Sequence, residues 1–230
     1  LIELRSALEQ GRSDSDKMVD IFAAIDVPDF SEAPTVYAAL ESASPNFSLF
    51  GERIALSTGE KFAIADYRQL TNERSVRHSH AKHSYHNERP FMVGALARLF
   101  INGNKLRGAA REAVERLNLP LPKFEGLLRH APPSVWSGRV KKSVTYPLGN
   151  ALHNNTAQAV ELVYSIERAM EIVKELLHTG TRGEKLPEVQ PRAATGTGAI
   201  EVPRGTLYHS YVFDEKGKVR SADVITPTAQ

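Results

Sequence analysis

The sequence predicts an α+β fold that is mainly helical, with a small antiparallel sheet near its C-terminus. A long core helix is predicted at residues 155–178, where apolar residues recur every three or four positions: Ala159, Val163, Ile166, Met170, Val173 and Leu177. Three runs typical of strands follow, at 198–202, 206–213 and 218–226. We therefore expect helices arranged around the 155–178 helix, with the sheet built after it.

The N-terminal part, residues 1–73, indicates helices and a hairpin. Apolar residues lie at helical spacing on both sides of Gly11, which predicts two short helices, at 1–10 and 14–25. Prolines then interrupt the path until "RIALSTGEKFAI", which predicts a hairpin that turns at 57–60. One or two helical turns are expected directly after this hairpin.

Residues 74–190 are interpreted as a helical core and 191–230 as the sheet region of one continuous unit. The core begins with a loop at 77–91, rich in histidine and basic residues, and continues with two helices over 91–119, the second starting at 102–104. An irregular stretch is expected at 120–149. The acidic residues of the helices are expected to be caps or parts of solvated faces: Asp16, Asp20, Glu161, Glu167 and Glu171.

The composition is that of an ordinary globular protein. Hydrophobic residues make up 41% and charged residues 24% of the 230 positions, and no apolar run approaches the roughly 18 residues of a membrane span. With 29 basic and 27 acidic residues, we expect no nucleic-acid partner. The absence of cysteine excludes disulfides, thiolate metal ligands and cysteine nucleophiles within these residues.

The last two strand runs are joined by Asp214–Gly217, whose closing glycine suits a type I turn, so a hairpin is expected. If the strands pair directly across this turn, Arg204 lies opposite Pro227 and Pro203 lies opposite Thr228. A bulge would shift this pairing by one residue. The hairpin thus predicts that a Pro-Arg and a Pro-Thr dipeptide meet at its open end.

Two prolines at one rim end the backbone ladder there, because proline donates no hydrogen bond. The arginine fork and the threonine hydroxyl are then free to hold an anionic or acceptor-rich group. The alternative is structural: the prolines protect a sheet edge, and Arg204 pairs on the surface with Glu201 or another acid.

Four histidines lie close together in the loop, at positions 78, 80, 83 and 86. This spacing is compatible with a metal clip. The basic neighbours Arg77, Lys82 and Arg89 repel a cation, so we favour hydrogen-bonding roles for these histidines.

The C-terminal segment "GTGAIEVPRGTLYHSYVFDEKGKVRSADVITPTAQ" closely resembles the end of the large, catalytic subunit of nickel-iron hydrogenases. The family pattern is G-x-G-x-x-E-A-P-R-G-x-L-x-H, followed after some strand residues by P-T; here Val202 replaces the alanine. "HAKHSYHNERPFMVGALARLFING", from His80, and "NNTAQAVELVYSIERAMEI", from Asn154, resemble the cytoplasmic, cofactor-reducing type of these subunits. The resemblance covers most of residues 74–228 and is loose before them.

The resemblance implies reversible hydrogen oxidation at a nickel-iron centre that carries cyanide and carbonyl ligands. In that family the P-R-G arginine projects over the metals and meets one cyanide, while the P-T segment binds the other. Carried over, Arg204 is the expected catalytic residue, and the expected surrounding residues are Pro203, Pro227 and Thr228.

Three further residues are candidates near such a site. Glu201 precedes the P-R-G motif and is expected to orient Arg204, with an exposed salt bridge as the alternative. His209 is either a hydrogen-bond donor close to the site or a satisfied core histidine. The resemblance also implies, weakly, that the backbone carbonyl of Val224 binds a magnesium ion.

The family binds its metals through two C-x-x-C motifs, and neither occurs here. We therefore interpret the chain as an internal fragment, about half of a large subunit, which alone is expected to hold no cofactor and to be inactive. The resemblance implies an iron-sulfur small subunit and diaphorase or cofactor-reducing subunits as partners, and a cytoplasmic location. The alternatives are a cysteine-free relative of the quinone-site subunit of respiratory complex I, or a non-enzymatic binding or assembly module.

Overall fold

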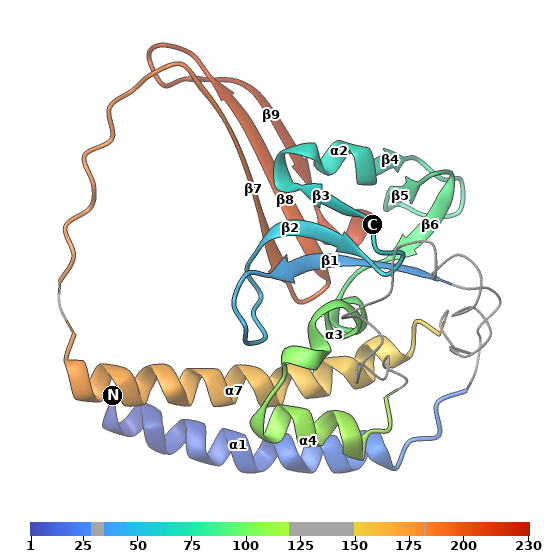
Figure 1. Ribbon diagram of the computed structural model, residues 1–230, viewed down its shortest axis with the longest axis vertical. Helices are drawn as coiled ribbons and strands as arrows, with labels where there is room; N and C mark the ends of the chain where they lie inside the picture. The colour runs from blue at the N-terminus through green and yellow to red at the C-terminus, as the bar shows by residue number, and fades with distance from the viewer. Residues whose placement is uncertain (29–34, 120–149, 182) are drawn as a thin grey trace.

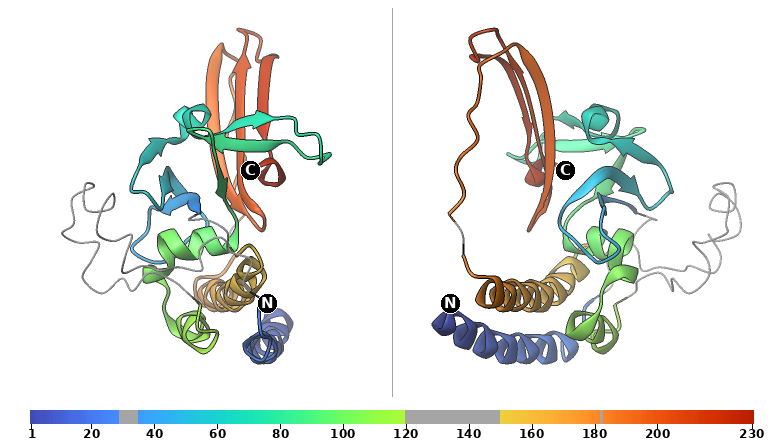
Figure 2. Two further views of the ribbon diagram at one scale, coloured as in Figure 1. Left: turned by 90° about the vertical axis from the view of Figure 1, so that its right-hand side faces the viewer. Right: turned by 60° about the vertical axis from the view of Figure 1, so that its left-hand side comes forward.

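The computed structural model describes residues 1–28, 35–119, 150–181 and 183–230 (Figure 1). The helices α1 (Ile2–Ala23), α7 (His153–Thr179) and α4 (Gly108–Arg116) lie side by side in one layer. Two sheets lie on the other side of α3 (Ala95–Asn102), as Figure 2 shows from two further directions. Among the described helices, none is long and apolar enough to cross a membrane.

The long helix predicted at 155–178 is confirmed as α7, and it packs on both α1 and α4. Its buried residues lie mostly in the first half: Thr156, Ala157, Ala159, Val160, Val163 and Val173. They belong to one apolar core that also includes Val19 of α1 and Leu99 of α3. The core helix therefore fixes the positions of its three helical neighbours.

The prediction of two N-terminal helices is wrong, because α1 runs without interruption through Gly11. A glycine inside a helix costs only about 1 kcal/mol relative to alanine, and packing against α7 offsets that cost. A Cβ at Gly11 would lie 3.8 Å from Cδ1 of Ile166, so the contact between the two helices passes through this position.

The residues between α1 and α3 in the sequence form a six-stranded sheet, which the sequence did not predict as a unit. Its strand order is β3-β2-β1-β6-β5-β4, and all neighbouring pairs are antiparallel except β1 with β6. The strands are β1 (Val36–Ser42), β2 (Gly51–Leu56), β3 (Lys61–Ala63), β4 (Asn72–Arg74), β5 (His83–His86) and β6 (Arg89–Met92). The β2–β3 pair confirms the predicted hairpin, and η1 (Ile64–Asp66) with α2 (Tyr67–Leu70) confirms the helical turns after it.

The prediction of a loop at 77–91 is wrong for its second half, which forms the β5–β6 hairpin. The turn residues Asn87 and Glu88 have φ values of 49° and 60°, the signature of a type I′ turn, which usually carries glycine. The prediction missed it because Asn-Glu lacks that glycine. The helix predicted from 102–104 begins later, as α4 at Gly108, after the short η2 (Gly103–Lys105).

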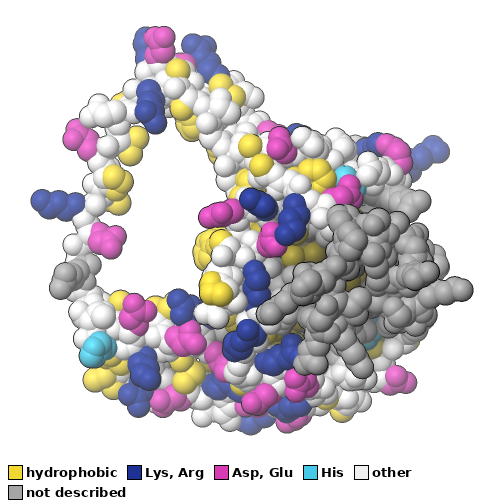
Figure 3. Space-filling view, in the orientation of Figure 1, with side chains coloured by type: hydrophobic (Ala, Val, Ile, Leu, Met, Phe, Trp, Pro, Cys, Tyr) yellow, Lys and Arg dark blue, Asp and Glu magenta, His cyan; other side chains and the backbone are white. Residues whose placement is uncertain are grey.

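The predicted C-terminal sheet is confirmed and consists of β7 (Ala194–Val202), β8 (Gly205–Phe213) and β9 (Val219–Ile225), followed by η3 (Pro227–Ala229). One of its faces joins a second apolar core, where Tyr208 and Ile225 pack with Leu40 and Tyr67. An exposed extended connection leads from α7 to β7, and Figure 3 shows that this connection, α7 and the sheet enclose an open ring. The irregular stretch predicted at 120–149 lies outside the described residues.

Candidate functional site

Pro203 and Arg204 form the two-residue turn of the β7–β8 hairpin, in which Val202 pairs with Gly205. Proline suits the first turn position because its φ is already fixed. The sequence indicated only that the strand breaks here and restarts at Thr206. The structure shows instead that Arg204 stands at the tip of a tight hairpin.

Gly205 lies where the hairpin meets two other segments. Its φ is +140°, and a Cβ built on it would lie 2.4 Å from Cγ2 of Val93 and 3.2 Å from Cβ of Pro227. A Cβ at Gly94, which has a φ of +99°, would lie 3.3 Å from the carbonyl oxygen of Arg204. The Pro-Arg-Gly turn is therefore packed tightly against the start of α3 and against Pro227.

The predicted strand register is wrong, and the contact between the two segments runs from Pro227 to Gly205. Tyr208 pairs with Ile225, and the β8–β9 ladder goes no further toward the turn. The register moved because the connection is longer than assumed: the N–H of Asp214 donates to the carbonyl of Lys218, and a bulge follows Val212. Pro227 reaches the turn through η3 and contacts Gly205, in place of the predicted pairing with Arg204.

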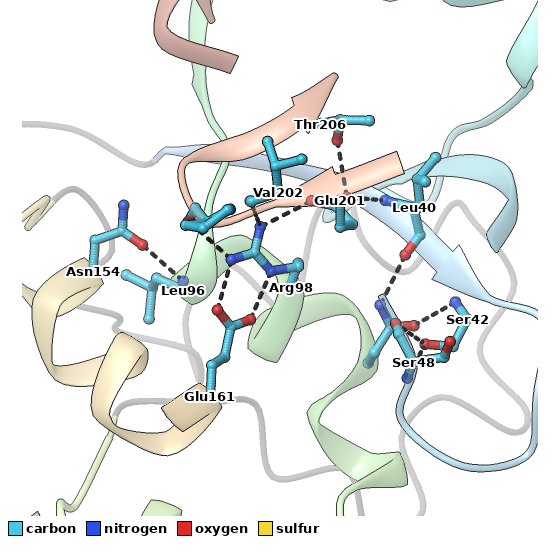
Figure 4. A network of polar contacts seen from close by, with 12 residues as sticks. Leu40, Ser42, Ser48, Leu96, Arg98, Asn154, Glu161, Glu201, Val202 and Thr206 are labelled. Carbon is cyan, nitrogen blue, oxygen red and sulfur yellow. Dashed lines mark hydrogen bonds and ion pairs between the residues drawn. The ribbon is translucent and has the colours of Figure 1, made fainter. Parts of the chain in front are cut away.

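A buried arginine, Arg98 of α3, lies directly beneath the turn (Figure 4). Its guanidinium binds Glu161 of α7 through two hydrogen bonds of 2.6 Å, and it binds Glu201 of β7 at 2.9 Å. It also donates to the backbone carbonyls of Val202 at 2.8 Å and of Pro203 at 3.0 Å. These contacts join helix α3, helix α7 and the β7–β8 turn at one point.

Glu201 is held from three sides. One carboxylate oxygen accepts hydrogen bonds from the N–H of Leu40 at 2.7 Å and from the hydroxyl of Thr206 at 2.9 Å, and the other accepts from Arg98. Its side chain is 1% exposed, so the alternative of an exposed salt bridge is wrong. The partner of Glu201 is Arg98 and not Arg204, and any effect on Arg204 passes through the backbone.

Burial and the neighbouring charges shift the pKa of Arg98 and of Glu201. Burial works against the charged form of Arg98, but the hydrogen bonds and charges of Glu161 and Glu201 outweigh it and raise the pKa of Arg98. Burial raises the pKa of Glu201, and this effect is partly offset by Arg98 and by the N–H of Leu40. The guanidinium of Arg98 therefore compensates the negative charges of the two carboxylates on either side of it.

Sequence reasoning missed Arg98 and assigned Glu161 to a solvated face, which is wrong, because its side chain is only 13% exposed. A signal was present in both cases. Arg98 is the one charged residue in "FMVGALARLFI", and Glu161 lies one helical turn after the buried Ala157. Glu167, assigned in the same way, accepts hydrogen bonds from the N–H groups of Ala109 and Ala110 and so caps α4.

Arg204 itself is exposed, and its guanidinium has no hydrogen-bond or ion-pair partner in the described part of the chain. Thr228 is also exposed, and its hydroxyl lies 3.3 Å from that of Thr226. The segment around Thr228 is anchored by Ser84, which donates to the carbonyl of Ala229 at 2.7 Å, and by Gln230, which donates to the carbonyl of Thr206 at 2.6 Å. Among the described residues, the site thus presents the unpartnered guanidinium of Arg204, with the Thr228 hydroxyl on an anchored backbone segment.

His209 and Val224 pair with each other across β8 and β9. His209 is half-buried, and its Nδ1 lies 2.7 Å from the hydroxyl of Tyr211. Val224 lies on β9, the edge strand of the sheet, where alternate backbone carbonyls face away from the ladder.

Within the described residues, no group of three or more histidine, aspartate or glutamate side chains is arranged to hold a metal ion. The rings of His78 and His83 lie 5.4 Å apart. His86 is buried, with Nδ1 3.3 Å from the carbonyl of Gln69 and Nε2 3.1 Å from the amide of Asn87.

Comparisons with known proteins agree with this architecture. The sequence is 33% identical over 227 residues to sulfhydrogenase 1 subunit alpha of Pyrococcus furiosus, a match that covers 99% of this chain and 46% of the relative. It is 36% identical over 182 residues to sulfhydrogenase 2 subunit alpha of the same organism, which covers 79% of this chain and 36% of the relative. The chain thus spans less than half the length of these two curated relatives. No family model matches the chain.

Among solved structures, an NAD+-reducing nickel-iron hydrogenase in its hydrogen-reduced state shares the fold with a TM-score of 0.69, over 99% of this chain and 49% of that chain, at 21% identity. The sequence identity over nearly the whole chain shows that the chain is related to the alpha subunits of hydrogenases, of whose length it spans less than half, and its fold is that of a nickel-iron hydrogenase subunit.

Proposed function

We propose that this chain is part of an enzyme that oxidises hydrogen reversibly at a nickel-iron centre, and that Arg204 contributes directly to that reaction. One observation carries the proposal: an arginine whose guanidinium has no partner among the described residues stands at the tip of a turn whose backbone is held by a fully buried arginine. A fixed backbone with a free donor fork suits a group that must meet a ligand in a defined geometry.

The residues present fit the surroundings of such a centre and not its metal ligands. The chain has no cysteine, so the thiolates of the centre would come from outside these 230 residues. The planar guanidinium of Arg204 and the hydroxyl of Thr228 can donate hydrogen bonds to anionic ligands such as cyanide, which are rich in acceptor atoms. When bound, the centre supplies Lewis acidity and redox chemistry.

The roles of the residues in this chain follow from their positions. Arg204 would donate to the anionic ligand and hold a proton near the reacting atoms. Pro203 fixes the turn that carries Arg204, and Thr228, which follows Pro227 in η3, would offer its hydroxyl to the same ligands. His209 and the carbonyl of Val224 remain weaker candidates, for a hydrogen-bond donor and a magnesium ligand respectively.

The proposal includes the partners and the location. The relatives are named as alpha subunits, and the solved structure as an NAD+-reducing hydrogenase. We infer that the complete protein assembles with an iron-sulfur small subunit and with cofactor-reducing subunits in the cytoplasm.

Replacing Arg204 by lysine in the complete enzyme tests the catalytic role. We expect the rate of hydrogen oxidation to fall by about 100-fold or more, because lysine keeps the charge but loses the planar fork, while the nickel content stays unchanged. The matched control is Arg220→Lys, which changes an exposed arginine of β9 that pairs only with Asp214. Unchanged turnover in Arg204→Lys would show that Arg204 does not have the proposed role.

The metal content of the isolated chain tests the proposal that the metal ligands come from outside it. Because these residues offer no thiolate, we expect the purified 230-residue chain to contain no stoichiometric nickel, iron or zinc by elemental analysis. A stoichiometric metal would show that the histidines or carboxylates of this chain form a site by themselves.

A further inference from the structure

We propose that Arg98 is the positioning residue for Arg204: it fixes the backbone of the Pro203-Arg204 turn and thereby the direction of the Arg204 side chain. This inference rests on the proposed function of Arg204. It assigns a task to a buried charged group that is distant from Arg204 in the sequence and that lies outside the P-R-G and P-T motifs.

Every N–H group of the Arg98 guanidinium makes a hydrogen bond. Arginine has five N–H donors, and all five of Arg98 are engaged: two with Glu161, one with Glu201, and two with the carbonyls of Val202 and Pro203. The carbonyls belong to the two residues that immediately precede Arg204. A side chain with fewer donors cannot hold the two carboxylates and the turn together.

The residues that contact Arg98 come from different elements of the fold. Arg98 is 1% exposed and is anchored on α3, while Glu161 comes from α7 and Glu201 from β7. The carboxylates therefore fix the plane of the guanidinium from opposite sides, and this plane determines where the two turn carbonyls lie (Figure 4). The position of the turn is therefore fixed by contacts with the helices as well as by its own strands.

The energetics of buried charge support the same role. A buried ion pair often gives no more stability than apolar residues of similar volume, so stability alone is a weak reason to keep three charges here. Geometric specificity is a better reason, because a misplacement of about 1 Å in a catalytic group can cost about 100-fold in rate.

Hydrogen exchange of backbone amides, measured on the complete enzyme, tests the proposal without reference to turnover. In Arg98→Lys we expect the amide of Gly205, which pairs with Val202 across the turn, to exchange about tenfold faster, because only the local opening of the turn becomes easier. The amides of Ser210 and Tyr211, in the middle of β8, should be unchanged. Unchanged protection at the turn, or an equal increase along the whole hairpin, would overturn the positioning role.

A double-mutant cycle on hydrogen oxidation separates positioning from general stabilisation. We expect Arg98→Lys alone to lower kcat by about 10- to 100-fold, and to have little further effect when Arg204 is already lysine, because both changes remove one function. Additive losses would show that Arg98 acts independently of Arg204. If Arg204→Lys alone has no effect, the proposed function fails, whereas loss in Arg204→Lys with full activity in Arg98→Lys makes only this inference fail.

Glu161→Gln provides a second route if Arg98→Lys does not accumulate. Glu161 is partly accessible, and glutamine preserves its size while it offers only one acceptor oxygen to Arg98. We expect the amide of Gly205 to exchange about threefold faster in this variant, with Glu171→Gln on the exposed face of the same helix as the matched control. Equal exchange in the two variants would contradict the proposal.

Discussion

At the scale of single residues, the glycine of the Pro-Arg-Gly turn is required by geometry. Gly205 combines a φ that other residues rarely adopt with a position where a side chain would meet Val93 and Pro227. The residue is therefore needed for the approach of β8 to α3 and η3, whatever chemistry Arg204 performs.

We expect Gly205→Ala to reduce the free energy of unfolding by roughly 2 to 4 kcal/mol, from backbone strain and from the contact with Val93. Chemical denaturation followed by circular dichroism measures this change. Gly196→Ala is the matched control, because that glycine of β7 has open space around its Cβ position, and alanine there should be neutral or slightly stabilising. Equal losses in the two variants would refute the steric explanation.

The residues of the candidate site differ in how far the sequence predicts them. Pro203, Arg204 and Thr228 are predicted because their motif is local and specific. Arg98 and Glu161 are not, because their function comes from contacts between residues far apart in the sequence: Arg98 binds Glu161, 63 positions away, and Glu201, 103 positions away. A lone charge in an apolar run indicates that a partner exists, but only the fold identifies the partner.

At the scale of elements, the outer strand β9 is tied to α2 by one carboxylate. Asp223 accepts hydrogen bonds from the hydroxyl of Tyr67 and from Nε of Arg68, the latter at 2.8 Å. Partial burial opposes the charge of Asp223, but these two donors prevail and lower its pKa. These contacts of Asp223 with Tyr67 and Arg68, called the Asp223 clamp below, hold the strand that leads to Pro227 and Thr228.

The lowered pKa of Asp223 predicts a specific pH dependence. The contribution of this clamp to stability is present above the pKa of an unfolded aspartate, about 3.9, and is lost as the pH falls through the lower folded value. We expect Asp223→Asn to lose up to about 1 kcal/mol at pH 7, since the pair is partly exposed. The difference from the parent should vanish near pH 2.

Urea denaturation of both proteins between pH 2 and pH 7 measures that difference. Glu215→Gln, a change of an exposed carboxylate in the β8–β9 connection, is the control and should follow the parent at every pH. A difference between Asp223→Asn and the parent that stays constant down to pH 2 would contradict the electrostatic explanation.

The elements themselves were predictable where a pattern is long or a turn carries its usual residues. The helix α7 and the strands β7, β8 and β9 satisfy this condition. The strands β1, β5 and β6 do not: β1 is one short run whose partners β2 and β6 come later in the chain, and β5–β6 turns at Asn87-Glu88. Pairing between distant strands, which supplies the energy of such a sheet, leaves little trace in any single segment.

At the scale of the whole molecule, the C-terminal sheet is attached by buried contacts and only weakly by its connection. Tyr208 and Ile225 lie in an apolar core with residues of β1 and α2, and Glu201 binds both Leu40 and Arg98. In contrast, the connection between α7 and β7 is exposed, with Leu186 at 94% and Val189 at 81%. The position of the P-R-G turn should therefore not depend on an intact connection.

Cutting this connection tests that conclusion. A specific protease site placed at residues 184–190 should be cleaved readily, because exposed extended backbone fits a protease. We expect the two pieces to elute together from a size-exclusion column in native buffer, since the buried contacts around Glu201 and Tyr208 remain. The same cut in a Tyr208→Ala variant should let the pieces separate, because the truncation removes about 3 kcal/mol or more from that interface. If the pieces of the parent separate as soon as the chain is cut, the connection and not the buried cluster holds the Arg204 turn in place.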